Sequence, residues 1–283
     1  MMKLTLADLS VLKHQHQKIT MITAYDAPSA RFADASGIDA ILVGDSAAMT
    51  VFGYEQTTAI TLEDMLLLTR AARRGTSRAL LIGDMPFGSV QVSDADTVSN
   101  AVRFVKEAGV DAVKIEGAGP MVRRIGAVID AGIPVVGHIG LTPQSVNQLG
   151  GYKPQGRTAA AAERLLDEAA ALERAGCVAI VLEAIPQLVA ASITKALTIP
   201  TIGIGAGVDC DGQVLVWHDV LGLGGPEFKA PKFVKQYADL GHEIVKALEA
   251  YIADVQSGRF PEARHTYAMP EDERERFETH RHK

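Results

Sequence analysis

The chain has few of the residues that mark several protein classes. Aromatic residues make up only 5%, and the two cysteines, Cys177 and Cys210, fit neither a disulfide framework nor a zinc-binding spacing. No run of lysine and arginine with interleaved aromatics is present, which argues against nucleic acid as a partner. No apolar run approaches the roughly 18 residues of a membrane span, and no signal-peptide pattern is visible. We therefore expect a cytoplasmic protein with no membrane partner.

The interior must instead be built from small aliphatic residues. Hydrophobic residues account for 47% of the 283-residue chain, so with few aromatics the core has to consist of alanine, valine, isoleucine and leucine. That composition is typical of parallel strands covered by helices. The length suits one large α/β domain, and no low-complexity linker divides it.

A strand-and-helix unit repeats along the chain. Short apolar runs bounded by turn residues indicate buried parallel strands, and apolar residues three and four apart indicate helices. The eight expected strands span residues 19–25, 40–45, 79–84, 112–117, 135–139, 179–183, 201–205 and 214–218. The helices expected between them span residues 28–36, 62–74, 94–108, 119–131, 159–175 and 186–197.

The connections differ at the two ends of these strands. Helix-to-strand turns are short and contain a glycine, as at Gly37 and Gly109, which is a usual stop signal after a helix. Strand-to-helix loops are long and polar, notably residues 46–61 and 140–157, and such loops are usually functional. Eight units with this asymmetry predict a single (β/α)8 TIM barrel with its site at the C-terminal ends of the strands. An open doubly wound sheet is the alternative, but no Gly-x-Gly-x-x-Gly follows the first strand.

Three further segments flank the barrel pattern. Residues 5–17 predict an N-terminal helix that could close the bottom of the barrel, with Thr5 as its cap. Residues 231–257 carry an apolar face and predict one long C-terminal helix. Residues 270–283 are mostly charged and predict a disordered tail, so the barrel domain is expected to span residues 1–269.

Carboxylates end three successive expected strands. Asp45, Asp84 and Glu116 each follow a short apolar run, and neighbouring parallel strands lie only about 4.8 Å apart. Three carboxylates that close repel one another unless a cation lies among them. They therefore predict a site for a hard divalent metal such as Mg²⁺. The alternative is that each residue merely caps the next helix.

Three more polar side chains are expected near these carboxylates. Lys114 shares the strand face of Glu116, where it is either an ion-pair partner or a group that binds a substrate carboxylate or oxyanion. His138, at the end of the fifth strand, is either a hydrogen-bonded core residue or a catalytic one. Glu183 ends the sixth strand, across the barrel, where a general base is the favoured role and a helix cap the alternative.

A glycine-rich run, Gly203-Ile-Gly-Ala-Gly207, follows at the end of the seventh strand. Only about six residues separate it from the eighth strand, too few for a covering helix. The run could cradle a phosphate, as in many barrels. Close backbone packing around the thin wall is the alternative that we favour.

Seven motifs, taken together and in order, resemble the ketopantoate hydroxymethyltransferase family. The likeness runs from near the N-terminus to about Tyr267, and such a set is far more specific than the barrel pattern. The motifs are Thr23-Ala-Tyr-Asp26, Val43-Gly-Asp-Ser46, Val113-Lys-Ile-Glu-Gly117, Gly137-His-Ile-Gly-Leu-Thr-Pro-Gln-Ser145, Gly150-Gly-Tyr-Lys-Pro-Gln-Gly156, Gly203-Ile-Gly-Ala-Gly207 and Asp211-Gly-Gln213.

The resemblance implies an activity and a fold type. It implies a barrel related to the phosphoenolpyruvate/pyruvate barrels that transfers a hydroxymethyl group from 5,10-methylenetetrahydrofolate to 3-methyl-2-oxobutanoate, through an enolate stabilised by Mg²⁺. The product is ketopantoate, on the route to pantothenate and coenzyme A. The resemblance also implies a homo-oligomer, a decamer of two pentameric rings.

The resemblance further implies roles for single residues. Glu183 matches the family's proton acceptor, and His138 stays a possible further site residue. The metal-linked carboxylates implied are Asp45, Asp84 and Glu116, and the ketoacid contacts implied are Asp45, Ser46, Asp84 and Lys114.

Two other functions stay open at this point. A Mg²⁺-dependent lyase or mutase of the phosphoenolpyruvate/pyruvate type, acting on a 2-oxoacid, would share the fold and the metal site. Such enzymes are expected to carry a loop cysteine as an acid/base, and neither Cys177 nor Cys210 sits in a long loop after a metal-bearing strand. A binding barrel without catalysis is the second alternative, and the intact set of polar residues argues against it.

Overall fold

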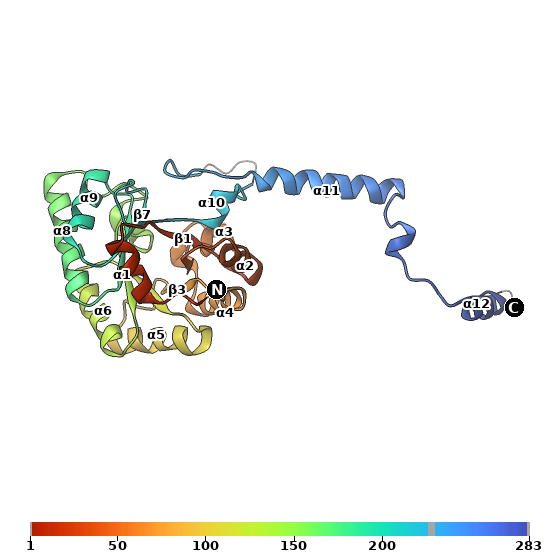
Figure 1. Ribbon diagram of the computed structural model, residues 1–283, viewed down its shortest axis with the longest axis horizontal. Helices are drawn as coiled ribbons and strands as arrows, with labels where there is room; N and C mark the ends of the chain where they lie inside the picture. The colour runs from red at the N-terminus through yellow and green to blue at the C-terminus, as the bar shows by residue number, and fades with distance from the viewer. Residues whose placement is uncertain (1, 226–229, 282–283) are drawn as a thin grey trace.

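The computed structural model describes residues 2–225 and 230–281. Eight parallel strands close into a barrel in chain order, with the last strand pairing the first, which confirms the expected (β/α)8 architecture (Figure 1). The strands are β1 (Ile19–Thr23), β2 (Ala40–Val43), β3 (Leu80–Asp84), β4 (Ala112–Glu116), β5 (Val135–Gly140), β6 (Ala179–Glu183), β7 (Thr201–Ile204) and β8 (Gly212–Leu215).

Helices cover the outside of the barrel (Figure 1). The segment between β7 and β8 carries none, as its length predicts. The α-helices are α1 (Leu6–His14), α2 (Ala27–Ala35), α3 (Ala47–Thr50), α4 (Leu62–Gly75), α5 (Asp94–Ala108), α6 (Pro120–Asp130), α7 (Val146–Leu149), α8 (Ala159–Arg174), α9 (Gln187–Ala196), α10 (Trp217–Leu221), α11 (Leu240–Ser257) and α12 (Glu271–Arg281). The 3₁₀ turns are η1 (Thr57–Ala59), η2 (Pro143–Ser145) and η3 (Ala263–His265).

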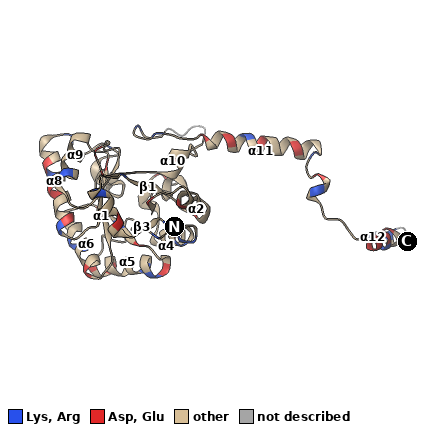
Figure 2. Cartoon of the chain, viewed as in Figure 1, with Lys and Arg blue, Asp and Glu red and all other residues tan. Residues whose placement is uncertain are grey.

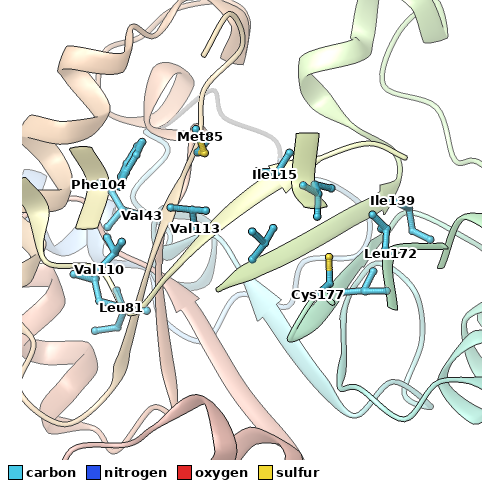
Figure 3. Close-up of a cluster of buried hydrophobic side chains, with 14 of the residues drawn as sticks. Val43, Leu81, Met85, Phe104, Val110, Val113, Ile115, Ile139, Leu172 and Cys177 are labelled. Carbon is cyan, nitrogen blue, oxygen red and sulfur yellow. The ribbon is translucent and has the colours of Figure 1, made fainter. Parts of the chain in front are cut away.

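The core has two layers. Inside the barrel, Leu9 of α1 clusters with Ile19 and Met21 of β1, which confirms that the N-terminal helix closes one end. Between the barrel and its helices, side chains of the strands interdigitate with those of the outer shell, and Figure 3 shows Phe104 of α5 among them. Phe104 is fully buried, and a Cβ on Gly83 of β3 would lie 2.5 Å from its ring. The absence of a side chain at Gly83 thus makes room for the largest buried residue.

Carboxylates at the N-terminal ends of the strands bind backbone N–H groups of neighbouring strands. Three aspartates accept such bonds at 2.8–2.9 Å: Asp39 from Thr20, Asp111 from Leu81 and Asp211 from Thr201. Asp34 of α2 accepts at 2.7 Å from Ala79, just before β3. Partial burial alone would raise the pKa of Asp34, but this and neighbouring hydrogen bonds lower it. Hydrogen bonds from backbone N–H groups to these four aspartates therefore hold this end of the barrel together, and we call it the fastened end.

The C-terminal helix begins later than the sequence predicts. The expected helix spans residues 231–257, but α11 begins at Leu240. Phe233 packs against Gly205, where an added Cβ would lie 2.9 Å from its ring. The N–H of Tyr237 donates to the carbonyl of Val220 at 2.8 Å. The apolar spacing before Leu240 therefore serves contacts with the barrel and not a helix face.

Two other parts of the chain also differ from expectation, besides shorter ends such as that of α1, which ends at His14 and not at residue 17. The predicted eighth strand spans residues 214–218, but β8 ends at Leu215 and α10 begins at Trp217, whose N–H donates to Thr23 Oγ1 at 2.9 Å. The charged tail predicts no regular structure, yet α12 forms within it. Glutamates and arginines one turn apart pair along α12, which Figure 2 shows crowded with both signs of charge. The division into a barrel domain ending at residue 269 and a tail stays a prediction.

The helix α11 reaches away from the barrel (Figure 1). It is 18 residues long and has the expected apolar spacing, but none of its residues is buried within this chain. Its exposed apolar side chains include Leu240, Ile244, Leu248 and Ile252. No helix in the described ranges is long and apolar enough to cross a bilayer.

Gly75 lies where α2 and α4 pack closely. A Cβ there would collide with the carbonyl oxygen of Ala27 and would lie 2.8 Å from the backbone nitrogen of Arg31. Backbone atoms cannot rotate away, so we expect Gly75→Ala to lower the free energy of unfolding by about 1–3 kcal/mol. Urea unfolding followed by circular dichroism measures the change.

Gly126 of α6 is the matched control. It lies within a helix, and no atom lies within 4 Å of a Cβ built on it. Alanine has the higher helix propensity, so Gly126→Ala should raise the free energy of unfolding by up to about 1 kcal/mol. If both substitutions changed the free energy of unfolding in the same direction, the close packing of α2 against Gly75 would be contradicted.

Candidate active site

The polar residues expected at the strand ends all line one cavity of about 800 Å³. Asp45 follows β2, Asp84 ends β3, and the next three strands continue the series around the barrel. The cavity wall includes the residues Asp45, Ser46, Asp84, Lys114, Glu116, His138 and Glu183. The barrel topology therefore brings together every residue that the sequence singles out, at the end opposite the fastening carboxylates.

Lys114 lies among the strand-end carboxylates. Its Nζ is 2.8 Å from Asp84 Oδ1 and 3.2 Å from Glu116 Oε1, and all three side chains are buried. Burial alone would lower the pKa of Lys114, but the charges of Asp84, Glu116 and Asp45 outweigh it and raise that pKa. Lys114 is therefore an ion-pair partner that stays protonated, and its charge faces the cavity.

Asp45 is the carboxylate that Lys114 neutralises least. Its backbone N–H donates to Asp84 Oδ2 at 3.1 Å, which places the two aspartates side by side. Burial raises the pKa of Asp45 well above its usual range, and the charges of Asp84 and Glu116 raise it further. Asp45, Asp84 and Glu116 share the Lys114 ammonium, and the His138 ring lies beside Glu116 alone, so the excess of negative charge lies at the two aspartates. A cation beside Asp45 would relieve that excess.

Gln144 holds this group together, and sequence reasoning missed it. Its side-chain amide donates to Asp45 Oδ2 and to the Met85 carbonyl, each at 3.0 Å. Its backbone N–H donates to Glu116 Oε2 at 3.0 Å. The available signal was a glutamine inside a long loop that follows a site-bearing strand. Its side chain links the loop after β5 to the ends of β2 and β3, and its backbone links that loop to the end of β4.

His138 lies between two carboxylates. Its Nδ1 is 3.2 Å from Glu116 Oε1, and its Nε2 is 3.3 Å from Glu183 Oε2. These are ion-pair distances, although neither nitrogen makes a well-directed hydrogen bond within the described part of the chain. Burial and the charge of Lys114 would lower the pKa of His138, but Glu116 and Glu183 raise it to about 9. His138 is thus a cation in the site and not an inert core residue.

Glu183 is the most accessible of the central carboxylates. Its side chain is 15% exposed, against 3% for Glu116 and 2% for Asp84. The helix-cap alternative fails, because α9 begins after Pro186 and has no side-chain cap. The next residue, Ala184, has a φ of 48°, which an alanine rarely adopts. The chain therefore turns sharply where it presents this carboxylate to the cavity.

Tyr25 is a second residue that sequence reasoning did not single out. Its hydroxyl lies 2.8 Å from Ser46 Oγ and accepts a hydrogen bond from Thr23 Oγ1 at 2.8 Å. Thr23 Oγ1 in turn accepts the backbone N–H of Trp217. This chain of hydrogen bonds fixes Ser46 relative to the start of α10.

Side chains from other parts of the barrel occupy the space next to the glycines of the run after β7. A Cβ on Gly203 would lie 2.9 Å from Cys210 Sγ, and one on Gly207 would lie 2.7 Å from Gln187 Cβ. The glycines therefore allow close packing of the backbone, as favoured above, and do not form a phosphate cradle. Cys177 and Cys210 are both buried free thiols, and neither lines the cavity.

The carboxylates do not form a preassembled cage. No group of three or more His, Cys, Asp or Glu residues in the described ranges is arranged to hold a metal ion. Mg²⁺ does not need such a group, because it usually binds one or two carboxylates and completes its shell with water and substrate oxygens. The adjacent pair Asp45 and Asp84 suits that mode, and all donors are hard oxygens.

The fold has clear relatives among solved structures. Phosphonopyruvate hydrolase in complex with oxalate and Mg²⁺ is similar with a TM-score of 0.59 and 14% identity, over 96% of this chain and 97% of that one. Phosphoenolpyruvate phosphomutase from Streptomyces platensis subsp. rosaceus is similar with a TM-score of 0.58 and 16% identity, over 90% and 88%. The class of fold is thus a (β/α)8 barrel similar to the barrels of these two enzymes.

Sequence comparison narrows the class to one family. Residues 3–263 match the family described as ketopantoate hydroxymethyltransferase. The 3-methyl-2-oxobutanoate hydroxymethyltransferase of Carboxydothermus hydrogenoformans is 51% identical over 97% of this chain and 99% of the relative. The enzyme of that name from Oleidesulfovibrio alaskensis is 52% identical over 97% and 94%. The chain belongs to the ketopantoate hydroxymethyltransferase family.

Proposed function

We propose that this chain transfers a hydroxymethyl group from 5,10-methylenetetrahydrofolate to 3-methyl-2-oxobutanoate, giving ketopantoate for pantothenate and coenzyme A biosynthesis. C3 of the ketoacid gives up its proton and forms a new bond to the methylene carbon. The two bonds from that carbon to N5 and N10 of the folate break, tetrahydrofolate leaves, and water supplies the hydroxyl oxygen. The observation that carries the proposal is Glu183, an accessible carboxylate without a capping role that faces the lysine–carboxylate group. Family membership supports the same conclusion.

Glu183 is the proposed proton acceptor. Its carboxylate opens onto the cavity, and the His138 ring beside it holds its orientation. The Lys114 ammonium supplies positive charge where negative charge develops on the ketoacid oxygen. Ser46, held by Tyr25, and Asp84 complete the proposed ketoacid contacts. A base and a fixed cation on facing walls are what removal of a proton beside a carbonyl requires.

A Mg²⁺ ion is the proposed cofactor, held by Asp45 and Asp84 with Glu116 as the third carboxylate. The excess of negative charge around Asp45 supports it. When bound, Mg²⁺ would polarise the carbonyl of the ketoacid and acidify the hydrogen on C3. Gln144 fixes the Asp45 carboxylate in place, so that this group need not reorganise during the reaction.

The two rival functions fit less well. A lyase or mutase that uses a loop cysteine finds no thiol on this cavity, because both cysteines are buried elsewhere. A barrel that has lost catalysis would have no need of a buried lysine and histidine among four carboxylates, since unpaired charges are costly to bury.

The assembly and the location are further proposals. The exposed apolar face of α11 supports contact with another copy of this chain, and we propose the homodecamer that the family resemblance implies. We propose a cytoplasmic location, with no nucleic-acid partner.

The direct test is turnover of the purified chain. With 3-methyl-2-oxobutanoate, 5,10-methylenetetrahydrofolate and Mg²⁺, proton NMR should show ketopantoate, and EDTA should stop its formation until excess Mg²⁺ is added. Omission of the folate should leave the ketoacid intact. Cleavage of a 2-oxoacid without folate, in place of ketopantoate formation, would support the lyase alternative.

A further inference from the structure

The residues that follow β8 line one part of the cavity, which we call the second lobe. This lobe lies against β8 and α10, and its wall includes Val216, His218, Asp219, Leu223 and Phe233. A cavity of about 800 Å³ is large for a five-carbon ketoacid and is in the size range of pockets that take drug-sized ligands. The lobe therefore has room for a second, larger molecule.

Asp219 is the acidic residue of this lobe, and Lys232, next to Phe233, also lines the cavity. Asp219 is only 7% exposed, yet no hydrogen bond or ion pair from any described residue reaches its carboxylate. Burial raises the pKa of Asp219 to about 6, and no neighbouring donor lowers it again. A buried carboxylate is usually paired, because burying one alone costs free energy. The group is still mostly ionised at neutral pH, and the described residues leave its carboxylate free to accept hydrogen bonds from a ligand.

The surroundings of Asp219 are apolar and aromatic. Leu223 and Val216 line the lobe, and Phe233 presents a partly exposed ring to it. The ring of His218 lies 5.5 Å from that of Tyr25, with its Nδ1 buried and unpartnered among the described residues. A flat heterocycle fits such walls, with one polar edge toward the carboxylate.

The lobe is joined directly to the ketoacid site. Tyr25 contacts His218 by its ring and Ser46 by its hydroxyl, and Ser46 is a proposed ketoacid contact. A ligand in the lobe would therefore lie next to the ketoacid. A donor of a one-carbon unit has to lie there for the new bond to form.

We propose that Asp219 binds the pterin ring of the folate donor, through the 2-amino group and the N3–H of its pyrimidine edge. The proposal rests on the proposed function. That edge carries two parallel N–H donors, which an ionised carboxylate accepts with one oxygen each. Asp219 is a binding and orienting residue in this account, and Glu183 keeps the proton transfer.

The test compares two ligands on two proteins. The ligands are tetrahydrofolate and its analogue with a methyl group in place of the 2-amino group, and calorimetry with Mg²⁺ and ketoacid present measures their dissociation constants. We expect the wild type to bind the analogue about 10- to 100-fold more weakly, because a hydrogen bond to a charged group is lost. Asp219→Asn should bind tetrahydrofolate more weakly by a similar factor and should no longer distinguish the two ligands.

The matched control is Asp239→Asn, which changes an exposed aspartate at the start of α11 without a side-chain cap bond. It should bind both ligands as the wild type does. The proposal is overturned if the wild type binds both ligands equally, which needs no variant, or if Asp219→Asn still distinguishes them by the wild-type factor. An Asp219→Asn protein with raised KM for folate and unchanged KM for the ketoacid excludes a general structural defect.

Failure of this proposal is separable from failure of the proposed function. A wild-type chain that forms no ketopantoate contradicts the function. A chain that forms ketopantoate but binds the analogue as tightly as tetrahydrofolate contradicts only the role of Asp219.

Discussion

Glu183→Gln should abolish the exchange of the C3 hydrogen of 3-methyl-2-oxobutanoate with deuterated water. With Mg²⁺ and ketoacid but no folate, the wild type should catalyse this exchange, because proton removal needs only the base and the polarised carbonyl. Glutamine keeps the size of the side chain but cannot accept the proton. We expect a loss of roughly 10²-fold or more, the usual contribution of a positioned general base. Proton NMR of the ketoacid in deuterated water follows the signal.

The matched control is Glu163→Gln, an exposed glutamate of α8 that faces solvent. It should exchange at the wild-type rate. Binding of the ketoacid to Glu183→Gln should persist, since His138 and Lys114 remain in place. Wild-type exchange by Glu183→Gln would assign the base to another group, with His138 the next candidate. Absence of exchange in the wild type would mean that folate must bind first.

Lys114→Met should be the most destabilising of the single changes considered. Methionine has a similar length but no charge, so Asp84 and Glu116 would be left buried without their cation. Removing one partner of a buried ion pair typically costs about 3–5 kcal/mol. Urea unfolding at pH 7 measures the loss. The loss should shrink as the pH falls, because protonation of the two carboxylates removes their unpaired charge.

Lys3→Met provides the comparison. Lys3 pairs with Asp111 at the other end of the barrel, where both side chains are partly exposed. A pair of that kind contributes about 0–1 kcal/mol, because solvent screens it. Equal losses in the two variants, or no pH dependence in Lys114→Met, would show that Lys114 acts through packing alone.

The barrel could be predicted from the sequence because its strands are buried on both faces. Residues 79–84 are an apolar run that ends in Asp84, and residues 112–116 are apolar apart from Lys114 and end in Glu116, so both strands and their carboxylate ends are visible in the sequence. The same pattern found Asp84, Glu116 and Glu183. The start of α11 could not be found in this way. An apolar spacing that ends in barrel contacts, as at Phe233, looks the same as one that continues a helix face.

Gln144, Tyr25 and Asp219 could not be found from the sequence, because their roles depend on which residues surround them in the folded chain. Gln144 and Tyr25 lie on loops beyond the strand ends, and their partners are distant in the chain. Asp219 lies in a short helix whose position against the cavity depends on how the chain returns after β8. The spacing of apolar residues predicts strands and helices, but it does not predict which side chains meet in the folded protein.

Acid acts with opposite sign on Asp34 and on two carboxylates of the cavity, Asp45 and Asp219, although Glu116 of the same cavity has a lowered pKa. At the fastened end, the pKa of Asp34 is lowered, so its stabilisation is complete above its ordinary value of 3.8 and is lost as the pH falls through the folded value. At the cavity end, the pKa values of Asp45 and Asp219 are raised, so ionised carboxylates there cost stability that acid would relieve. Hydrogen-bonded aspartates at the fastened end thus add stability that offsets the cost of the carboxylates buried around the cavity. Changes that weaken the fastened end should narrow the range of active-site substitutions that a lineage of such enzymes can accept.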